Sequence, residues 1–419
     1  MTFDEAEDYL LGLELFGMRF GLDRMFGLMT ALGMPQHRFA SVHVVGSNGK
    51  SSTTRFTTAI LRRHGLRTAG YTSPHLRSFR ERIEVGEKPV SQERFATAVD
   101  RAAQAAAIVE RRLDADDRVT QFEALTAAAF HEMAASRVDV AVIEAGLGGR
   151  HDATNVIPSR VQALTGVGLE HTRWLGPTPV HIAEEKLAVV RDHATLVVGP
   201  LDPEVHAVAQ RAAADHHATL VTAPALGETP ATRGLEMRAA GAFQRTNFAL
   251  AAAAAEAFLD RPLDPAAVRA AASETGVPGR LEIVDGEPLT LLDAAHNPDG
   301  ARALVAALGE IAGDHAPLVL VASILEDKDA AGLLETLLPI AGHVVFTRCS
   351  NPRALPPGTL ESLSGTLGGP AAETVAEPRA AVTRARELAG PGGAVLATGS
   401  IYLVADLVRN PAQNRASTL

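Results

Sequence analysis

Residues 42–54 read VHVVGSNGKSSTT, and this stretch decides the fold. Its end, Gly49-Lys50-Ser51, matches the last part of the phosphate-binding pattern G-x-x-x-x-G-K-[ST]. The first glycine of that pattern would fall at Val44, whereas the chain has its glycine at Gly46. The residues therefore indicate a nucleotide-phosphate loop, and the alternative is a plain strand–helix turn rich in small polar residues.

The segments on either side of this loop favour the nucleotide interpretation. Ser41–Val45 is a short apolar, β-branched run typical of a strand. After Lys50, apolar residues recur at helical spacing until His64-Gly65, and Thr68–Thr72 is a second strand-like run. Strand, glycine turn, helix and strand form the βαβ unit that a phosphate loop requires.

The rest of the chain alternates strands and helices in two blocks. Val138–Glu144 and Val161–Gly168 are strand-like runs of the first block, and the alternation restarts at Leu289–Asp293 after a Pro- and Gly-rich stretch. The 419 residues exceed one ordinary core. We predict an α/β protein with an N-terminal P-loop ATPase domain, mostly parallel, at 1–284 and a smaller Rossmann-like domain at 285–419.

Composition excludes several classes of partner. The net charge of −10 argues against a general nucleic-acid or acidic-membrane surface, and no apolar run reaches membrane-spanning length. The acidic, amphipathic start of the chain does not resemble a signal peptide. The single cysteine, Cys349, cannot form an internal disulfide. We therefore expect a cytoplasmic protein that binds neither nucleic acid nor membrane.

Polar side chains follow several of the predicted strands. Glu144 ends a strand and precedes a glycine-rich loop, which suits a hard cation such as Mg²⁺, although a solvated glutamate beside a turn is the alternative. Asp293 and His296 end a strand of the second block, where open α/β sheets bind ligands. Arg82 and Arg280 are candidate clamps for a carboxylate or a phosphate.

Many segments, in order, resemble the folylpolyglutamate synthase/dihydrofolate synthase family, a branch of the Mur ligase superfamily. The loop of this superfamily reads G-T-x-G-K and lacks the earlier glycine. The segments that carry the resemblance are FGLDRM (20–25), HVVGSNGKSS (43–52), YTSPHLRSFRERI (71–83), FEALTAAAF (122–130), VDVAVIEAGLGGRHDATNVI (138–157), GLEHTRWLG (168–176), IAEEK (182–186), FQRTN (243–247), PGRLE (278–282), LLDAAHNPDGARAL (291–304), ILEDKD (324–329), PRALPP (352–357) and TGSIY (398–402).

The resemblance implies an ATP-dependent carbon–nitrogen ligase. A pteroate or folate carboxylate would become an acyl phosphate, and L-glutamate would then displace phosphate. The substrates would be ATP, dihydropteroate or reduced folates, and L-glutamate. The metal would be Mg²⁺, with a monovalent cation such as K⁺ as a further candidate. We expect a monomer, and the choice between dihydrofolate synthase, folylpolyglutamate synthase and a bifunctional enzyme stays open.

The resemblance also implies roles for individual residues. The ATP-binding residues would be Gly46, Ser47, Asn48, Gly49, Lys50, Ser51, Asn247, Arg280, Asp293 and His296. The metal would be held by Ser73, Glu144, His171 and Lys186, with Lys186 carbamylated, and the catalytic residues would be Lys50, Lys186 and His171. The pteroate or folate would contact Arg19, Phe20, Gly21, Arg82, Thr120, Gln121, Phe122, Glu123, His151, Asp152 and Ala153.

Some residues depart from the family pattern. Ser47 and Ser51 replace a threonine and a glycine in the loop, which stays small. Glu170 replaces an aspartate beside the metal-binding histidine, and His151 replaces a leucine of the pterin pocket. The role of Ser51 and the substrate preference are therefore open.

Two other functions compete with the folate assignment. A Mur-superfamily ligase with a non-folate acceptor would carry a whole nucleotide-sugar-binding domain before the loop, and only 45 residues precede Gly46. A non-catalytic nucleotide-binding regulator has no need for Ser73, Glu144, His171 and Lys186 together.

Overall fold

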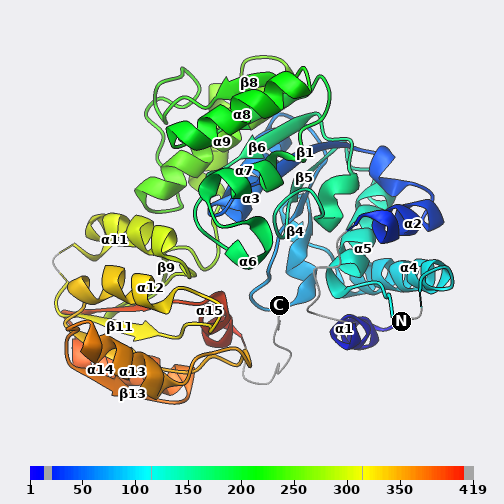
Figure 1. The fold of residues 1–419 in the computed structure, drawn as a ribbon. Coiled ribbons are helices and arrows are strands. Elements are labelled where there is room, and N and C mark those ends of the chain that lie inside the picture. Colours follow the sequence, from blue (N-terminus) through cyan, green and yellow to red (C-terminus); the bar gives the residue numbers. More distant parts are fainter. Residues whose placement is uncertain (14–20, 115, 314, 410–419) are drawn as a thin grey trace.

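The computed structural model describes residues 1–13, 21–114, 116–313 and 315–409, and these form two α/β domains (Figure 1). The described part of the first domain contains an eight-stranded sheet in the order β4-β3-β2-β5-β1-β6-β7-β8, parallel except where β3 pairs with β2 and β4. Its strands are β1 (Ala40–Val45), β2 (Thr68–Tyr71), β3 (Ile83–Val85), β4 (Lys88–Pro89), β5 (Val140–Glu144), β6 (Val161–Leu164), β7 (Thr195–Val198) and β8 (Thr219–Thr222).

The second domain contains a smaller sheet of six described strands in the order β13-β12-β11-β14-β10-β9, parallel except for β9. Its strands are β9 (Glu282–Gly286), β10 (Leu289–Leu292), β11 (Leu318–Ala322), β12 (His343–Phe346), β13 (Ala372–Thr374) and β14 (Ala394–Thr398). The observed sheets confirm the predicted fold class of two α/β domains, the second smaller than the first.

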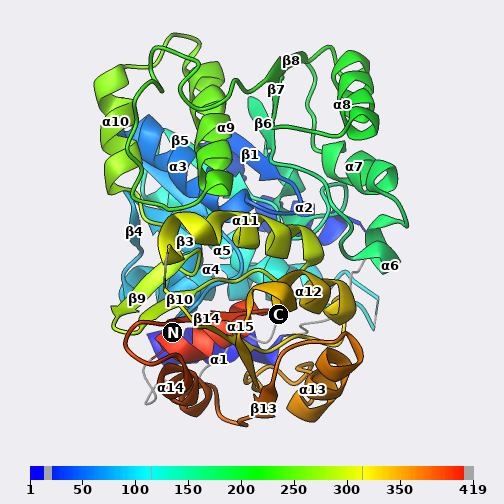
Figure 2. The same ribbon diagram turned by 90° about the vertical axis from the view of Figure 1, so that its left-hand side faces the viewer.

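Helices cover both faces of each sheet (Figures 1 and 2). The helices of the first domain are α1 (Phe3–Gly12), α2 (Asp23–Ala31), α3 (Lys50–Arg63), α4 (Gln92–Glu110), α5 (Gln121–Ala135), α6 (Thr172–Leu175), α7 (Pro179–Leu187), α8 (Pro203–Asp215), α9 (Ala242–Leu259) and α10 (Pro265–Glu274), with 3₁₀ turns η1 (Pro35–His37), η2 (Phe79–Arg82) and η3 (Ala153–Val156). The helices of the second are α11 (Pro298–Ala312), α12 (Ala330–Leu337), α13 (Pro357–Thr366), α14 (Pro378–Ala389) and α15 (Ile401–Val408), with η4 (Leu338–Ile340).

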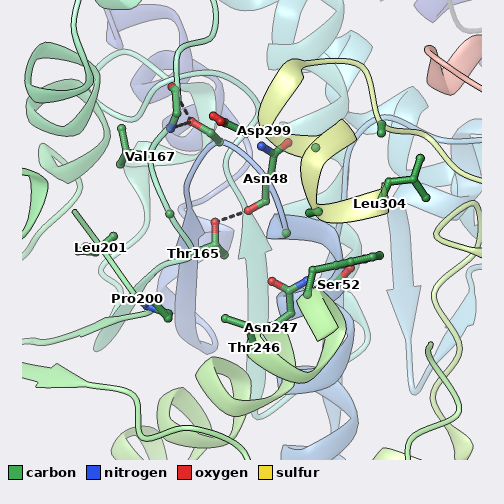
Figure 3. Close-up of a pocket in the computed structure, with 18 of the residues that line it drawn as sticks. Asn48, Ser52, Thr165, Val167, Pro200, Leu201, Thr246, Asn247, Asp299 and Leu304 are labelled. Atoms are coloured by element: carbon green, nitrogen blue, oxygen red, sulfur yellow. Dashed lines mark hydrogen bonds between the residues drawn. The ribbon is translucent and has the colours of Figure 1, made fainter. Parts of the chain in front are cut away.

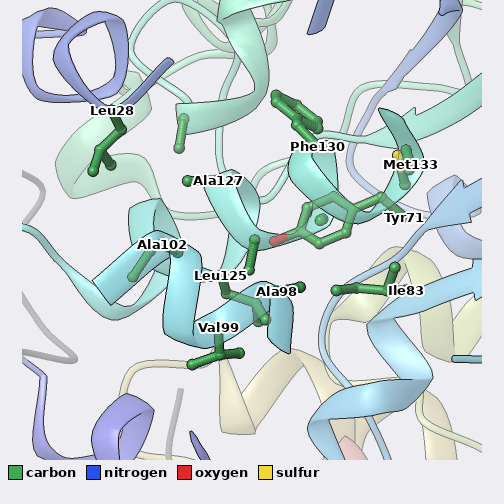
Figure 4. Packing of buried hydrophobic residues seen from close by; sticks show 14 of the residues in the cluster. Leu28, Tyr71, Ile83, Ala98, Val99, Ala102, Leu125, Ala127, Phe130 and Met133 are labelled. Carbon is green, nitrogen blue, oxygen red and sulfur yellow. The ribbon is translucent and has the colours of Figure 1, made fainter. Parts of the chain in front are cut away.

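Strand alternation explains why both faces are covered. Val140 and Val142 of β5 pack with α3, α9 and α10, whereas Ala141 and Ile143 pack with α4 and α5 on the other face. Figure 4 shows the buried cluster on the face covered by α4 and α5, where Tyr71 lies among side chains of these two helices. Strands buried on both faces are continuously apolar, which is why they were recognisable in the sequence.

The second sheet begins slightly before the boundary expected between residues 284 and 285. β9 spans Glu282–Gly286 and pairs antiparallel with β10, so the expected boundary falls inside a strand of the second sheet. Part of the Pro- and Gly-rich stretch expected as a linker therefore forms an edge strand. Its Ile283 and Val284 are exposed and do not show the buried apolar pattern of a central strand.

The register of the first sheet places the phosphate loop beside Glu144. Val44 of β1 pairs with Glu144 of β5, and Val45 pairs with Leu164 of β6. β6 ends at Leu164 and not at Gly168 as expected, since the next residues bond the loop: Ser47 N donates to Gly166 O at 2.8 Å. The loop thus follows the central strand at the carboxyl edge of the sheet.

The described residues include no helix that is long and apolar enough to cross a bilayer.

A buried histidine on β1 gives the fold a testable pH dependence. His43 is fully buried, its Nε2 lies 2.8 Å from Thr154 Oγ1, and burial, with a smaller effect of Arg191, lowers its pKa to about 3. The unfolded chain binds a proton near pH 6.5, and the folded protein does so only near pH 3. His43 therefore costs stability as the pH falls through this window, by up to about 1.4 kcal/mol per pH unit.

We expect His43→Gln to flatten the fall in unfolding free energy between pH 6.5 and the lowest pH at which denaturant unfolding is reversible. The exposed His37→Gln is the control for loss of a surface histidine. Equal slopes for wild type and His43→Gln would show that His43 takes up its proton equally in both states.

Candidate active site

Thr165 explains why the glycine of the phosphate loop stands at position 46. A Cβ at Gly46 would lie 1.9 Å from Thr165 Oγ1, and the backbone there has φ of +146°. The same hydroxyl donates to Asn48 O at 2.6 Å and so fixes the loop from β6. Gly49, with φ of +84°, has Asn247 Oδ1 of α9 at 2.3 Å from the place of its missing Cβ.

Two lysines converge on one carbonyl of this loop. Lys50, the first residue of α3, donates from Nζ to Gly46 O at 2.9 Å and to Ser47 O at 3.1 Å. Lys186 of α7 donates to the same Gly46 O at 2.9 Å. With the positive end of α3 behind them, these ammonium groups favour an anion at the loop.

Glu170 neutralises the deeper of the two lysines. Lys186 is 1% exposed, and its Nζ lies 2.6 Å from Glu170 Oε1. Burial alone would raise the pKa of Glu170, but the ammonium groups of Lys186 and Lys50 outweigh it and hold that pKa well below its usual range. The glutamate that departs from the family pattern is therefore an anion in a buried ion pair.

Glu144 accepts hydrogen bonds from two serines beside the loop. Ser51 Oγ donates to Glu144 Oε1 at 2.9 Å, and the backbone N of Ser73 donates to Oε2 at 3.1 Å. Burial raises the pKa of Glu144, against the opposing effect of Lys50. The described residues contain no group of three or more His, Cys, Asp or Glu side chains that could hold a metal. A cation here would need hydroxyl, water or ligand oxygens as well, which suits Mg²⁺.

His171 faces the second domain. It precedes α6 with a left-handed φ of +46°, and its Nε2 lies 3.4 Å from Lys328 Nζ. Burial, and then Lys328, lower its pKa to about 4, so the imidazole is neutral at physiological pH. Among the contacts of the described residues, His171 is joined to Lys328, while Ser73 is joined to Glu144.

A cavity of about 460 Å³ opens beside the loop and between the domains (Figure 3). Thr165, Asn48 and Asn247 lie on one side of it, and Asp299 and Leu304 of α11 on another. Its lining residues are Ser47, Asn48, Gly49, Ser52, Thr165, Gly166, Val167, Gly168, Pro200, Leu201, Asp202, Val205, Phe243, Thr246, Asn247, Arg280, Asp293, Ala295, Asp299, Gly300, Ala303 and Leu304.

The second domain brings Asp293 and Arg280 to this cavity. Asp293 accepts from Leu281 N at 2.9 Å and from Ala295 N at 2.8 Å. Burial raises its pKa, opposed by Arg280. His296 is part-buried, and burial followed by Lys328 lowers its pKa to about 4. Of the candidate ATP residues, six line this cavity: Ser47, Asn48, Gly49, Asn247, Arg280 and Asp293.

Seven of the candidate folate residues lie at the start of α5 or in the loop after β5: Thr120, Gln121, Phe122, Glu123, His151, Asp152 and Ala153. The Phe122 ring occupies the space beside Gly146, 2.6 Å from the place of a Cβ. Asp152 and Ala153 lie in the same glycine-rich loop, where Asp152 accepts from Leu147 N at 2.8 Å and also from Thr154. Gly21 and His151 are part-buried, whereas Arg19 and Phe20 lie outside the described residues.

Several of these folate candidates also have structural partners. Thr120 and Glu123 form the capping box of α5, and Glu123 binds Arg24 of α2 at 3.0 Å. Gln121 Nε2 donates to Leu10 O at 2.8 Å, and its Oε1 has no partner among the described residues. Arg82 is fully buried and donates to His75 Nδ1 at 3.0 Å.

Sequence reasoning missed two residues of the site. Thr165 fell inside a run expected to be strand, and Lys328 lay unassigned in ILEDKD. Both act across a long sequence separation, so no local pattern marked them. Asn297 stands in the expected ligand-binding segment after Asp293, but its hydrogen bonds to Asn48 of the loop, at 3.1 and 3.3 Å, were not predicted.

Comparison with known proteins gives one family-model match. Residues 279–401 match the model described as Mur ligase, glutamate ligase domain. This range covers most of the second sheet.

Curated relatives match along most of the chain. A dihydrofolate synthase/folylpolyglutamate synthase of Mycobacterium tuberculosis is 36% identical, covering 83% of this chain and 78% of the relative. A folylpolyglutamate synthase of Lacticaseibacillus casei is 33% identical, covering 91% and 92%. A probable bifunctional folylpolyglutamate synthase/dihydropteroate synthase of Haloferax volcanii is 34% identical over 97% of this chain, but the chain spans only 50% of that relative.

Solved structures share the fold. Mycobacterium tuberculosis folylpolyglutamate synthase complexed with ADP superposes with a TM-score of 0.89 at 32% identity, covering 97% of both chains. E. coli FolC in complex with DHPP and ADP gives a TM-score of 0.85 at 27% identity, again covering 97% of both. A synthase of Yersinia pestis complexed with AMPPNP and a Mn ion gives 0.83 at 28% identity, with the same coverage.

The buried ion pair predicts a stability effect. Glu170→Gln keeps the size of the side chain but leaves the Lys186 ammonium without its anion, so we expect the unfolding free energy to fall by about 2 kcal/mol. Denaturant unfolding measures it. Glu184→Gln is the matched control, because Glu184 is exposed and its contact to Arg211 is 3.7 Å. A Glu170→Gln protein as stable as that control would mean that the pair contributes nothing.

Proposed function

The chain belongs to the folylpolyglutamate synthase/dihydrofolate synthase family of ATP-dependent ligases, and we propose that it joins L-glutamate to a pteroate or folate carboxylate. The observation that carries this proposal is the convergence of both domains on one anion-binding loop. Lys50 and Lys186 supply positive charge from the first domain, while Asp293, Arg280 and Lys328 approach from the second.

ATP would bind across the domain junction. Its phosphates would lie on the loop of residues 46–51, where backbone N–H groups, Lys50 and the α3 N-terminus attract anions. The nucleoside would enter the neighbouring cavity, which contains Asn247, Arg280 and Asp293. Solved relatives bind ADP or ATP analogues, which supports this placement.

We propose a magnesium ion beside Glu144. Glu144 would bind it together with Ser51 or Ser73, and His171 and carbamylated Lys186 would serve a second ion. Such an ion would neutralise phosphate charge. The neutral state of His171 leaves a nitrogen lone pair for a metal.

The chain's own residues would orient two successive attacks. A carboxylate oxygen of the acceptor attacks the γ-phosphorus, the bond to ADP breaks, and an acyl phosphate results. The glutamate amine then attacks the carbonyl carbon, loses a proton, and inorganic phosphate leaves. Lys50 would stabilise the negative charge of the γ-phosphoryl group during transfer. The Lys328 ammonium would bind an anionic substrate on the side of the second domain.

The acceptor would lie between α5 and the glycine-rich loop. Phe122 offers an aromatic ring beside Gly146. A solved relative with bound folate and another with DHPP support a folate-type acceptor. We also propose that the protein is a monomer in the cytoplasm.

The function is tested by phosphate release. With ATP, Mg²⁺ and L-glutamate, we expect release only when dihydropteroate or a reduced folate is added, and the faster acceptor identifies the physiological step. Lys50→Ala should lower the rate about 100-fold or more, because the cation at the transferred phosphoryl group is lost. Lys88→Ala, on an exposed strand end, is the control. Release that ignores both acceptors would contradict the folate assignment.

We also propose that Lys186 becomes carbamylated. Burial lowers its pKa, which favours the neutral amine that reacts with CO₂, and Glu170 opposes this. The carbamate and Glu170 would then be two adjacent anions that require a cation between them.

Carbamylation predicts chemical rescue. Lys186→Ala should lose activity, and added acetate or another short carboxylic acid should restore part of it by replacing the carbamate. The same acids should not restore Lys50→Ala. Lack of any rescue in Lys186→Ala would remove the support for a carbamate.

A further inference from the structure

Two asparagines join the phosphate loop to the second domain. Asn297 Nδ2 donates to Asn48 Oδ1 at 3.1 Å, and Asn48 Nδ2 donates to Asn297 Oδ1 at 3.3 Å. Asn48 lies between the two glycines of the loop, and Asn297 is the N-cap of α11. Residues 249 positions apart thus form a reciprocal amide pair across the domain junction.

Both partners are anchored in rigid elements. The Asn48 carbonyl accepts from Thr165 Oγ1 at 2.6 Å. Asn297 Oδ1 accepts from Gly300 N at 2.7 Å, and the Asn297 carbonyl accepts from Ala301 N at 3.0 Å. Asn297 is 6% exposed, so leaving its amide group without a partner is costly.

The first turn of α11 lies close to the loop at a second point. A Cβ at Gly168 would lie 1.9 Å from Asp299 Oδ2, so the two residues lie in close contact. Gly168 in turn donates to Ser47 Oγ at 3.0 Å. The start of α11 therefore contacts the loop both directly, at Asn48, and through Gly168.

The chemistry of the cap separates two roles of Asn297. An N-cap needs only a side-chain oxygen, which serine, threonine or aspartate supplies as well. The pair with Asn48 also needs an N–H donor on the same side chain, which among the usual capping residues only asparagine carries. The amide nitrogen of Asn297 thus serves the loop and not the helix.

We propose that Asn297 is a positioning residue that holds α11 against the phosphate loop and so sets the width of the nucleotide cavity. Asp299, Gly300, Ala303 and Leu304 of α11 line that cavity together with the loop residues Ser47–Gly49. Loss of the pair lets this wall move away and weakens nucleotide binding. This inference rests on the proposed function only where it is tested by nucleotide binding.

The first test measures ADP binding by calorimetry. Asn297→Ser keeps the cap and removes the pair, and we expect the Kd for ADP to rise about 5- to 10-fold, as for one or two neutral hydrogen bonds. Asn48→Ser should also weaken binding. In the Asn48→Ser background, adding Asn297→Ser should change Kd less than about 2-fold, because the pair is already broken. If the two substitutions together raise Kd by the product of their separate factors, the proposal is wrong.

The second test needs no nucleotide. Hydrogen exchange in the unliganded protein should become faster in peptides covering residues 46–52 of Asn297→Ser, while residues 298–301 stay as protected as in wild type because serine still caps α11. Unchanged exchange of the loop would overturn the proposal. Asn297→Asp gives a further check, since it keeps the cap but places a carboxylate oxygen against Asn48 Oδ1.

Failure of the proposed function is distinguishable from failure of this pair. If ADP binding depends on Asn297 but no folate acceptor causes phosphate release, the proposed role of Asn297 stands and the proposed function is wrong. If folate acceptors are turned over but Asn297→Ser matches wild type in ADP affinity and loop exchange, the proposed function stands and the role of Asn297 is wrong.

Discussion

The site depends on one backbone carbonyl that accepts from two ammonium groups. Gly46 O bonds both Lys50 and Lys186, each at 2.9 Å. Two cations this close repel each other, and Glu170 makes its direct ion pair with Lys186. Lys50, whose hydrogen bonds go to two neutral carbonyls, is the one able to turn toward a phosphate. The loop is therefore organised for an anion before any ligand arrives, which reduces the reorganisation that binding requires.

The sheet makes this arrangement possible. The central strand β1 lies between β5 and β6, and the loop follows it at the edge where Glu144 ends β5 and Thr165 follows β6. Three strands thus bring a loop, a carboxylate and a hydroxyl together. Parallel strands end at the same edge, so residues distant in sequence become neighbours there.

Features of the site that depend on nearby residues could be predicted from the sequence, and features that depend on distant residues could not. The loop and its helix are local to one βαβ unit, and Glu144 ends a continuous apolar strand, so local patterns were enough to find them. Thr120 and Glu123 carry the T-x-x-E spacing of a capping box, a local signal for their structural role. The contacts of Thr165, Lys328 and Asn297 join segments more than a hundred residues apart, and β9 exists only because β10 pairs with it. Such features require the tertiary structure.

Glu170 stands where the family pattern has an aspartate, and this difference affects the charge around Lys186 and the phosphate loop. The extra methylene lengthens the reach of the carboxylate, which lies 2.6 Å from Lys186 Nζ. In that pair Lys186 stays a cation, and the centre favours phosphate. Conversion of Lys186 to a carbamate would reverse its sign, break the pair and leave two anions that only a divalent cation can hold together. In the proposed carbamate state, the same two side chains would link metal binding to the charge that the loop presents, and Glu170 would set the balance between the two states.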